Sequence, residues 1–237
     1  MALRQTTSAI LVGAGQSTRM EGVDKIFAPV NGDPLILHSL KQFQEHPSVD
    51  HISLVLNSQN VEHGRQLIQN ERWNKVHCIS VGGARRQDSV RIGLSKLPQS
   101  DIIIVHDIAR PLVDATLISR GLNAVQITGA ATAILSIPDT LKSIGPDGHL
   151  DSIIIDRTTL RLVQTPQVFK HTVLEHAHNT VHNTVTDDTT MTELIGIRTE
   201  SFEGSRLNFK VTTPEDLIIV RAILQSKPQM DATNQVN

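Results

Sequence analysis

Short apolar runs alternate along the chain with segments whose apolar residues recur at helical spacing. Near-continuous apolar runs are typical of strands buried on both faces of a sheet. They occur at Ser8–Val12, His51–Leu56, Val76–Val81, Asp101–Val105 and Ala131–Ile137. Helical spacing falls between them, at Pro34–Phe43, Val61–Ile68, Gln87–Leu97 and Asp114–Ile127. This alternation predicts an α/β fold, a Rossmann-like and mostly parallel sheet with helices on both faces.

The alternation ends after Pro138. Thr140–Ile144 and Leu150–Ile155 flank the turn sequence Gly145–Gly148, which predicts a β-hairpin arm projecting at about residues 138–160. The remaining predicted elements are a helix at Thr172–His182, short strands at Glu200–Phe202 and Leu207–Val211, and a helix at Pro214–Leu224. The polar tail from about Lys227 is expected to fray. We expect one domain over residues 1–237, because no linker or repeat interrupts the pattern.

Composition and charge narrow the function class. The 237 residues include 22 Lys+Arg and 24 Asp+Glu, and aromatic residues make up 3% with no tyrosine. Near-neutral charge and scarce aromatics argue against a nucleic-acid partner. No apolar run approaches the ~18 residues of a membrane span, and the single cysteine, Cys78, excludes an internal disulfide. We therefore expect a cytoplasmic protein that acts on small molecules and has no membrane partner.

A loop of small residues, Gly13–Gly15, follows the first predicted strand. Such a loop lets backbone N–H groups approach a phosphate at the carboxyl end of a strand. The dinucleotide fingerprint fails because position 18 is Thr18, and the P-loop fails because Lys25 precedes Ile26. Arg19 and Lys25 suit a polyphosphate instead. The alternative interpretation is a ligand-free turn followed by solvated cations.

A series of short motifs follows along the chain, in this order: Gly13-Ala14-Gly15-x-Ser17-x-Arg19-Met20 with Lys25, Gly82-Gly83-x-x-Arg86-x-x-Ser89-Val90, Val105-His106-Asp107-x-Ala109-Arg110-Pro111, Asp139-Thr140-x-Lys142, Asp156-Arg157, Gln164-Thr165-Pro166-Gln167-x-Phe169, Thr186-Asp187-Asp188 with Glu193, and Asn208-Phe209-Lys210-Val211-Thr212 with Pro214-Glu215-Asp216-Leu217. These motifs and their order resemble those of the 2-C-methyl-D-erythritol 4-phosphate cytidylyltransferase family, within the sugar-nucleotidyltransferase superfamily. The similarity runs from about residue 8 to about residue 224.

Some positions depart from the family pattern. Asp24-Lys25-Ile26 stands where Pro-Lys-Gln is usual, and Ile108 replaces a small alanine. An Asp-Lys pair also resembles the molybdenum-cofactor guanylyltransferases. That alternative does not explain His106-Asp107 or Thr165-Pro166-Gln167.

The resemblance implies a nucleotidyltransferase-type fold and a reaction of CTP with a polyol phosphate that releases pyrophosphate. It also implies Mg²⁺ as cofactor and a homodimer joined through the arm. The implied roles are transition-state stabilisation by Arg19 and Lys25; acceptor positioning by Arg157, Lys210, Thr140, Thr165 and Thr186; nucleotide binding by Gly13, Ala14, Gly15, Ser17, Gly82, Gly83, Arg86, Ser89, Asp107 and Arg110; and metal binding by Asp107 and Asn208.

Alternatives remain at the level of both function and residue. The acceptor could be another polyol phosphate, such as ribitol 5-phosphate, or the chain could bind nucleotide without catalysis. Arg110 could form a structural corner. His176, His178 and His182 do not share one helix face, so we expect solvated histidines rather than metal ligands.

Overall fold

One seven-stranded sheet organises the chain, with strand order β5-β4-β1-β6-β8-β7-β9. The computed structural model describes residues 4–15, 24–69, 73–152 and 155–233, with side chains described as far as residue 226. Strand β8 runs antiparallel to both neighbours, β6 and β7, and the other neighbouring pairs are parallel. The strands are β1 (Thr7–Gly13), β4 (His51–Leu56), β5 (Val76–Val81), β6 (Ile102–Asp107), β7 (Ala130–Ser136), β8 (Arg161–Lys170) and β9 (Glu200–Glu203).

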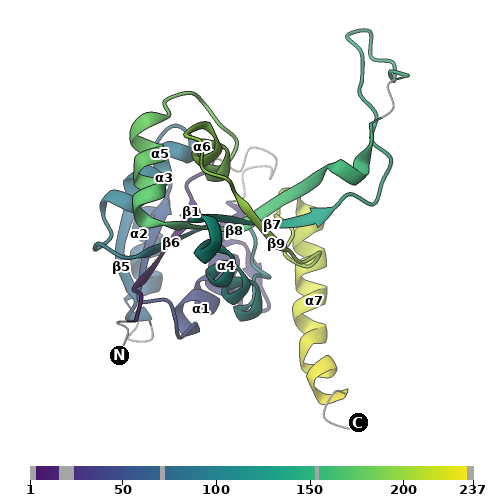
Figure 1. Ribbon diagram of the computed structural model, residues 1–237. Coiled ribbons are helices and arrows are strands. Elements are labelled where there is room, and N and C mark those ends of the chain that lie inside the picture. The colour runs from purple at the N-terminus through teal and green to yellow at the C-terminus, as the bar shows by residue number, and fades with distance from the viewer. Residues whose placement is uncertain (1–3, 16–23, 70–72, 153–154, 234–237) are drawn as a thin grey trace.

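Helices cover both faces of this sheet (Figure 1). Side chains of a strand alternate between its two faces, so Leu11 packs in one core cluster and Ile10 in another. Helices α1 and α4 supply the first cluster, whereas α3 and α5 supply the second. The predicted fold class is confirmed. The helices are α1 (Leu35–Glu45), α2 (Val61–Ile68), α3 (Arg86–Ser95), α4 (Ala115–Thr128), α5 (His171–Thr180), α6 (Asp188–Leu194) and α7 (Pro214–Thr233).

A small hairpin, β2 (Pro29–Val30) with β3 (Asp33–Pro34), lies outside the main sheet. Helix α7 packs on it, where Leu217 and Val220 share a buried cluster with Val30. The helix continues to Thr233, so residues 227–233 of the predicted polar tail are helical in their backbone. Within the described residues, no helix is long and apolar enough to cross a membrane.

The arm projects from the sheet beyond β7 and β8 (Figure 1). The two strands predicted within it are wrong, because among its described residues only an isolated bridge joins Ile144 to Leu150. Both side chains are largely exposed, at 67% and 70%. A two-stranded ribbon without a covering layer is marginal in water, which explains the missing ladder.

Other parts of the second half also differ from the prediction. No strand forms over Leu207–Val211; instead the backbone N–H of Val211 donates to the carbonyl of Ala109 at 2.7 Å. Strand β8 and helix α6 are present but not predicted.

Candidate active site

A cavity with a volume of about 570 Å³ opens at the carboxyl ends of β1 and β6. The loop after β1, the start of α3 and the loop after β9 close its sides. The predicted residues that line it are Gly13, Ala14, Gly15, Lys25, Gly83, Arg86, Ser89, Asp107 and Lys210.

The loop between β5 and α3 forms one wall of this cavity. The Ser89 hydroxyl accepts from the Gly83 N–H at 3.1 Å and donates to the Arg85 carbonyl at 3.2 Å. A Cβ at Gly82 would collide with that of Ala14 and lie 2.7 Å from Ser89 Oγ. Glycine therefore lets the β5 loop approach the β1 loop, although Gly82 lies behind the cavity lining.

Lys25 enters the cavity from a 3₁₀ turn, η1 (Lys25–Phe27). The Asp24 carboxylate caps this turn by accepting from the Ile26 N–H at 3.2 Å. The same carboxylate accepts from the side-chain amides of Asn57, at 3.3 Å, and Asn60. The Asp-Lys departure from the family pattern thus supplies a hydrogen-bonded anchor between this turn and the β4–α2 connection.

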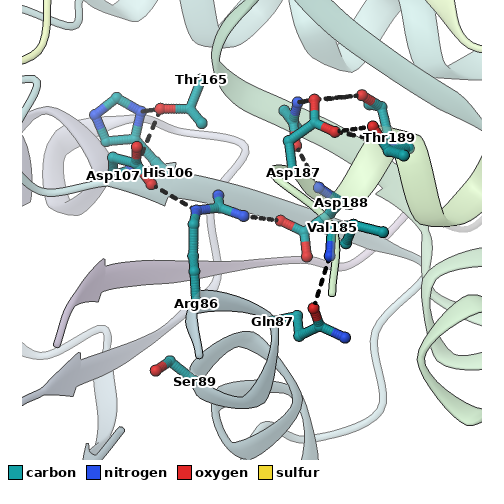
Figure 2. A network of polar contacts seen from close by, with 12 residues as sticks. Arg86, Gln87, Ser89, His106, Asp107, Thr165, Val185, Asp187, Asp188 and Thr189 are labelled. Atoms are coloured by element: carbon teal, nitrogen blue, oxygen red, sulfur yellow. Dashed lines mark hydrogen bonds and ion pairs between the residues drawn. The ribbon is translucent and has the colours of Figure 1, made fainter. Parts of the chain in front are cut away.

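Asp107 ends β6 and lies between two cations. Its Oδ1 is 3.0 Å from Arg86 Nε and its Oδ2 is 2.8 Å from Lys210 Nζ. Burial favours a raised pKa, but the charges of Arg86 and Lys210 hold the pKa of Asp107 far below its usual range. The carboxylate is therefore ionised at neutral pH. Figure 2 shows it facing Arg86.

His106, beside Asp107, is fully buried next to the site and has a neutral ring. Burial lowers its pKa to about 4. Its ring nitrogens lie 3.1 Å from Thr165 Oγ1 and 3.2 Å from the Arg110 carbonyl. Thr165 Oγ1 also accepts from the Asp107 N–H at 3.1 Å (Figure 2). This network fixes Thr165 on β8 against the end of β6.

A second cavity, of about 320 Å³, adjoins the first. The two share Arg86, Asp107 and Lys210 in their linings. The second cavity also brings together the predicted residues Arg110, Thr165 and Thr186. Two ligands bound side by side would thus meet at one carboxylate and two cations, an arrangement suited to polyanion chemistry.

Asn208 lies behind the second cavity and is bonded to Arg110, which lines it. Asn208 is fully buried, lines neither cavity, and donates from Nδ2 to the Thr165 carbonyl at 2.7 Å. Arg110 Nη1 donates to the Asn208 carbonyl at 2.9 Å. Arg110 therefore forms a structural corner while also lining the cavity.

The family model for IspD, 2-C-methyl-D-erythritol 4-phosphate cytidylyltransferase, matches residues 7–226. The chain belongs to this family. A Dehalococcoides mccartyi (strain CBDB1) protein of that name is 42% identical over 225 residues, covering 95% of this chain and 99% of its own.

Solved structures agree with this assignment. The Thermus thermophilus enzyme of the same name is 28% identical with a TM-score of 0.75, covering 92% of this chain and 98% of that one. A 4-diphosphocytidyl-2C-methyl-D-erythritol synthase from Anaerococcus prevotii supports the fold, with 24% identity, a TM-score of 0.80 and coverage of 93% and 99%.

Two residues that the IspD resemblance assigns to the acceptor, Thr140 and Arg157, lie on the arm and line neither cavity. Both are exposed, and Arg157 Nη1 donates to the Pro138 carbonyl. The structure does not bring them to the cavities of their own chain. Ser17 and Arg19 lie outside the described residues.

Sequence reasoning missed a buried hydrogen bond between His178 and Asp188 beside the cavities. The expectation that His178 is solvated is wrong: it is 2% exposed, and its Nε2 lies 3.2 Å from Asp188 Oδ1. His176 and His182 are exposed. The spacing of Leu174, Ala177 and His178 on α5 was an available signal, because these positions share one helix face.

Asp107 is the one carboxylate among the described residues that line the first cavity, whereas Asp187 lines only the second. Among the residues that the structure describes, no three His, Cys, Asp or Glu side chains gather as a metal site. Mg²⁺ usually takes one or two protein carboxylates, with phosphates and water as its other ligands. Asp107 fits this pattern for an ion that arrives with a nucleotide, whereas Asn208 lies behind the lining.

Proposed function

We propose that this chain transfers the cytidylyl group of CTP to 2-C-methyl-D-erythritol 4-phosphate and releases pyrophosphate. The observation that carries the proposal is the pair of cavities that share Arg86, Asp107 and Lys210. One cavity has the glycine loop expected for a triphosphate, and the other has hydroxyl and cationic groups suited to a polyol phosphate. Membership of the IspD family names the substrates.

In this reaction an oxygen of the acceptor phosphate attacks the α-phosphorus of CTP. A new phosphoanhydride bond forms while the bond between the α-phosphorus and the bridging oxygen to the β-phosphate breaks, so the electron pair leaves with pyrophosphate. The acceptor needs no general base, because its second pKa is about 6. The main barrier is repulsion between two polyanions, which positioning and fixed cations lower.

The described residues supply these functions. Backbone N–H groups of Gly13–Gly15 can bind phosphate oxygens, and Lys25 lies in the same cavity to stabilise charge on the transferred group. Gly83 and Ser89 offer a small polar wall for cytosine. Lys210 lies between the cavities, where it can contact the acceptor phosphate. Arg19 is assigned its transition-state role by the family motif alone.

Mg²⁺ would be held by Asp107 together with nucleotide phosphates. When bound, the ion neutralises phosphate charge during transfer. Asp107 already has two cationic partners, so metal binding requires Arg86 or Lys210 to share its oxygens or shift toward phosphate.

We further propose a homodimer in which each arm completes the partner's site. The arm and the start of β8 expose Ile144, Leu150, Leu162 and Val163. Exposed apolar side chains clustered on one projection favour a protein interface. Arg157 lies on the same projection, away from its own cavities. A two-fold pair of arms would cover the apolar side chains and bring Arg157 to an acceptor phosphate.

The decisive experiment measures pyrophosphate release from CTP and Mg²⁺ with a panel of polyol phosphates. We expect turnover with 2-C-methyl-D-erythritol 4-phosphate, and little with ribitol 5-phosphate or without acceptor. Replacing CTP by GTP tests the guanylyltransferase alternative. Turnover with GTP equal to that with CTP, or no turnover with any acceptor, would contradict the proposal.

A further inference from the structure

Asp188 is a fully buried carboxylate joined to the site through Arg86. Its Oδ2 lies 2.6 Å from Arg86 Nη1, and its Oδ1 lies 3.2 Å from His178 Nε2. The side chains of Asp188 and His178 are 0% and 1% exposed. Arg86 begins α3, Asp188 begins α6 and His178 lies on α5, so the contacts tie three helices together.

Arg86 divides its nitrogens between two carboxylates, as Figure 2 shows. Nε faces Asp107 at the cavity, while Nη1 faces Asp188 behind it. Asp188 lines neither cavity, so it does not reach a bound substrate directly. Its influence on the site must pass through Arg86.

The division leaves one oxygen of Asp107 for Lys210. A guanidinium with a single carboxylate partner favours a bidentate pair, which occupies both carboxylate oxygens. If Asp188 were neutral, Arg86 could turn toward such a pair with Asp107 and compete with Lys210. The charge of Asp188 opposes this rearrangement, and the hydrogen bond from His178 keeps that carboxylate in place.

We propose that Asp188, held by His178, is a positioning residue for the transfer reaction. It fixes Arg86 so that Asp107 and Lys210 keep their places where the two cavities meet. This inference rests on the proposed function and adds to it the residues behind the cavity wall.

The competing interpretation is that the pair only packs α5 and α6. Other contacts already hold these helices. Gln167 accepts from the Asp188 N–H at 3.1 Å and donates to Asp187 Oδ2 at 2.8 Å. Ala177 and Met191 share a buried cluster. The helix positions therefore do not depend on the Asp188 carboxylate alone.

The test compares matched variants in kcat/KM for CTP, in CTP affinity by calorimetry and in thermal midpoint. Asp188→Asn keeps the shape and removes the charge, and we expect kcat/KM to fall about 10-fold or more, as for a coupled network. His178→Leu removes the hydrogen-bond donor to Asp188, and its kcat/KM should fall by a similar factor. His178→Gln keeps a donor and should recover most of the activity. His176→Leu, on the exposed face of α5, is the control and should match wild type.

A double-mutant cycle shows whether the effect passes through Arg86. In an Arg86→Gln background, His178→Leu should cost less than about 2-fold, because the residue through which it acts is gone. If the loss in the double variant equals the product of the losses in Arg86→Gln and His178→Leu, the two residues act independently and the inference is overturned. Wild-type kcat/KM and CTP affinity in both Asp188→Asn and His178→Leu would also overturn it, as would losses that only follow the thermal midpoint.

The binding measurements separate this inference from the proposed function. A wild-type chain that binds CTP but releases no pyrophosphate with any acceptor would contradict the function. The variants' relative affinities for CTP would still support or overturn the positioning role. If Asp188→Asn does not fold, the comparison of His178→Leu with His178→Gln decides the question by itself.

Discussion

Lys25 is one of the described cationic residues that line the nucleotide cavity of the proposed reaction. Lys25→Ala removes a fixed cation without touching the core, so we expect kcat to fall by roughly 10²–10³, as for loss of one transition-state donor. Arg19→Ala should behave alike. Pyrophosphate release gives the rate and circular dichroism checks the fold. Near-wild-type turnover in either variant would remove that residue from the mechanism.

Asp24 holds in place the turn that carries Lys25, because its carboxylate joins η1 to Asn57 and Asn60. Asp24→Ala frees the turn while keeping the lysine, so kcat should fall by about 10-fold, less than for Lys25→Ala. The matched control is Asp33→Ala, which removes an exposed carboxylate from the neighbouring hairpin. Equal rates for both aspartate variants would show that the anchor has no catalytic effect.

His46 makes stability depend on pH. Burial lowers its pKa below 6.5, and its Nδ1 accepts from the Ser48 N–H at 3.2 Å, as only a neutral ring can. Below pH 6.5 the unfolded chain then binds more protons than the folded chain, so the free energy of unfolding falls as pH falls. His46→Gln should flatten this slope by up to about one proton.

Urea unfolding at a series of pH values, followed by the fluorescence of the single Trp73, measures that slope. His149→Gln is the control, because the His149 side chain is 85% exposed. A His46→Gln slope identical to wild type would contradict the assignment.

Residue types in the family blocks allowed most cavity-lining groups to be predicted, but not the hydrogen bond between His178 and Asp188 behind them. Asp107 and Lys210 lie in separate blocks that name them. His178 lies outside those blocks, and its pairing with Asp188 exists only because α5 and α6 pack together. The spacing of Leu174, Ala177 and His178 could have indicated that His178 is buried, but not that its partner is Asp188 on another helix.

At the scale of elements, α3 packs against the sheet through Gly93, which leaves no room for a side chain there. A Cβ there would lie 2.6 Å from Ile10 Cγ2 and 2.9 Å from Val55 Cγ2. Gly93→Ala should push the helix outward and lower the free energy of unfolding by about 1–3 kcal/mol, as overpacking does. Urea unfolding measures the change. Ser95→Ala, exposed on the same helix, should shift it by less than about 0.5 kcal/mol.

The parallel part of the fold was predictable because its strands are short, apolar-rich runs that alternate with segments of helical spacing. His51–Leu56 and Val76–Val81 were predicted with the observed bounds. Strand β8 was missed because Gln164-Thr165-Pro166-Gln167 interrupts its apolar pattern. Those polar side chains are buried because each finds a partner within the protein: Thr165 at the end of β6, Gln164 in the loop after β9, and Gln167 at Thr132 of β7 and at Asp187, which caps α6. Tertiary partners make a strand here that local pattern excludes.

At the scale of the whole molecule, the arm separates Arg157 from the cavities of its own chain. In the proposed dimer, mixing inactive Arg157→Ala with inactive Lys25→Ala should restore activity. A mixed dimer then has one intact site and one doubly damaged site. Full subunit exchange should return roughly a quarter of wild-type activity, a statistical expectation for symmetric dimers.

Subunit exchange is verified by native mass spectrometry of differently tagged chains. Each variant incubated alone provides the baseline. A mixture that stays inactive despite exchange would place Arg157 in its own chain's site and reject the swapped arm. Monomers at micromolar concentration would reject the dimer itself.

Strand β8 belongs to two regions at once. Its first residues, Arg161–Val163, are exposed beside the arm, and Thr165, a few residues on, is buried in the wall of the acceptor cavity. In a dimer of the proposed kind, pairing of the arms and capture of the polyol phosphate would order the same backbone. Each event would lower the entropic cost of the other, and thermodynamic reciprocity makes that gain equal in both directions. Subunit association and acceptor recognition would then be one cooperative equilibrium, in which a cell's supply of acceptor sets how much of the enzyme is assembled.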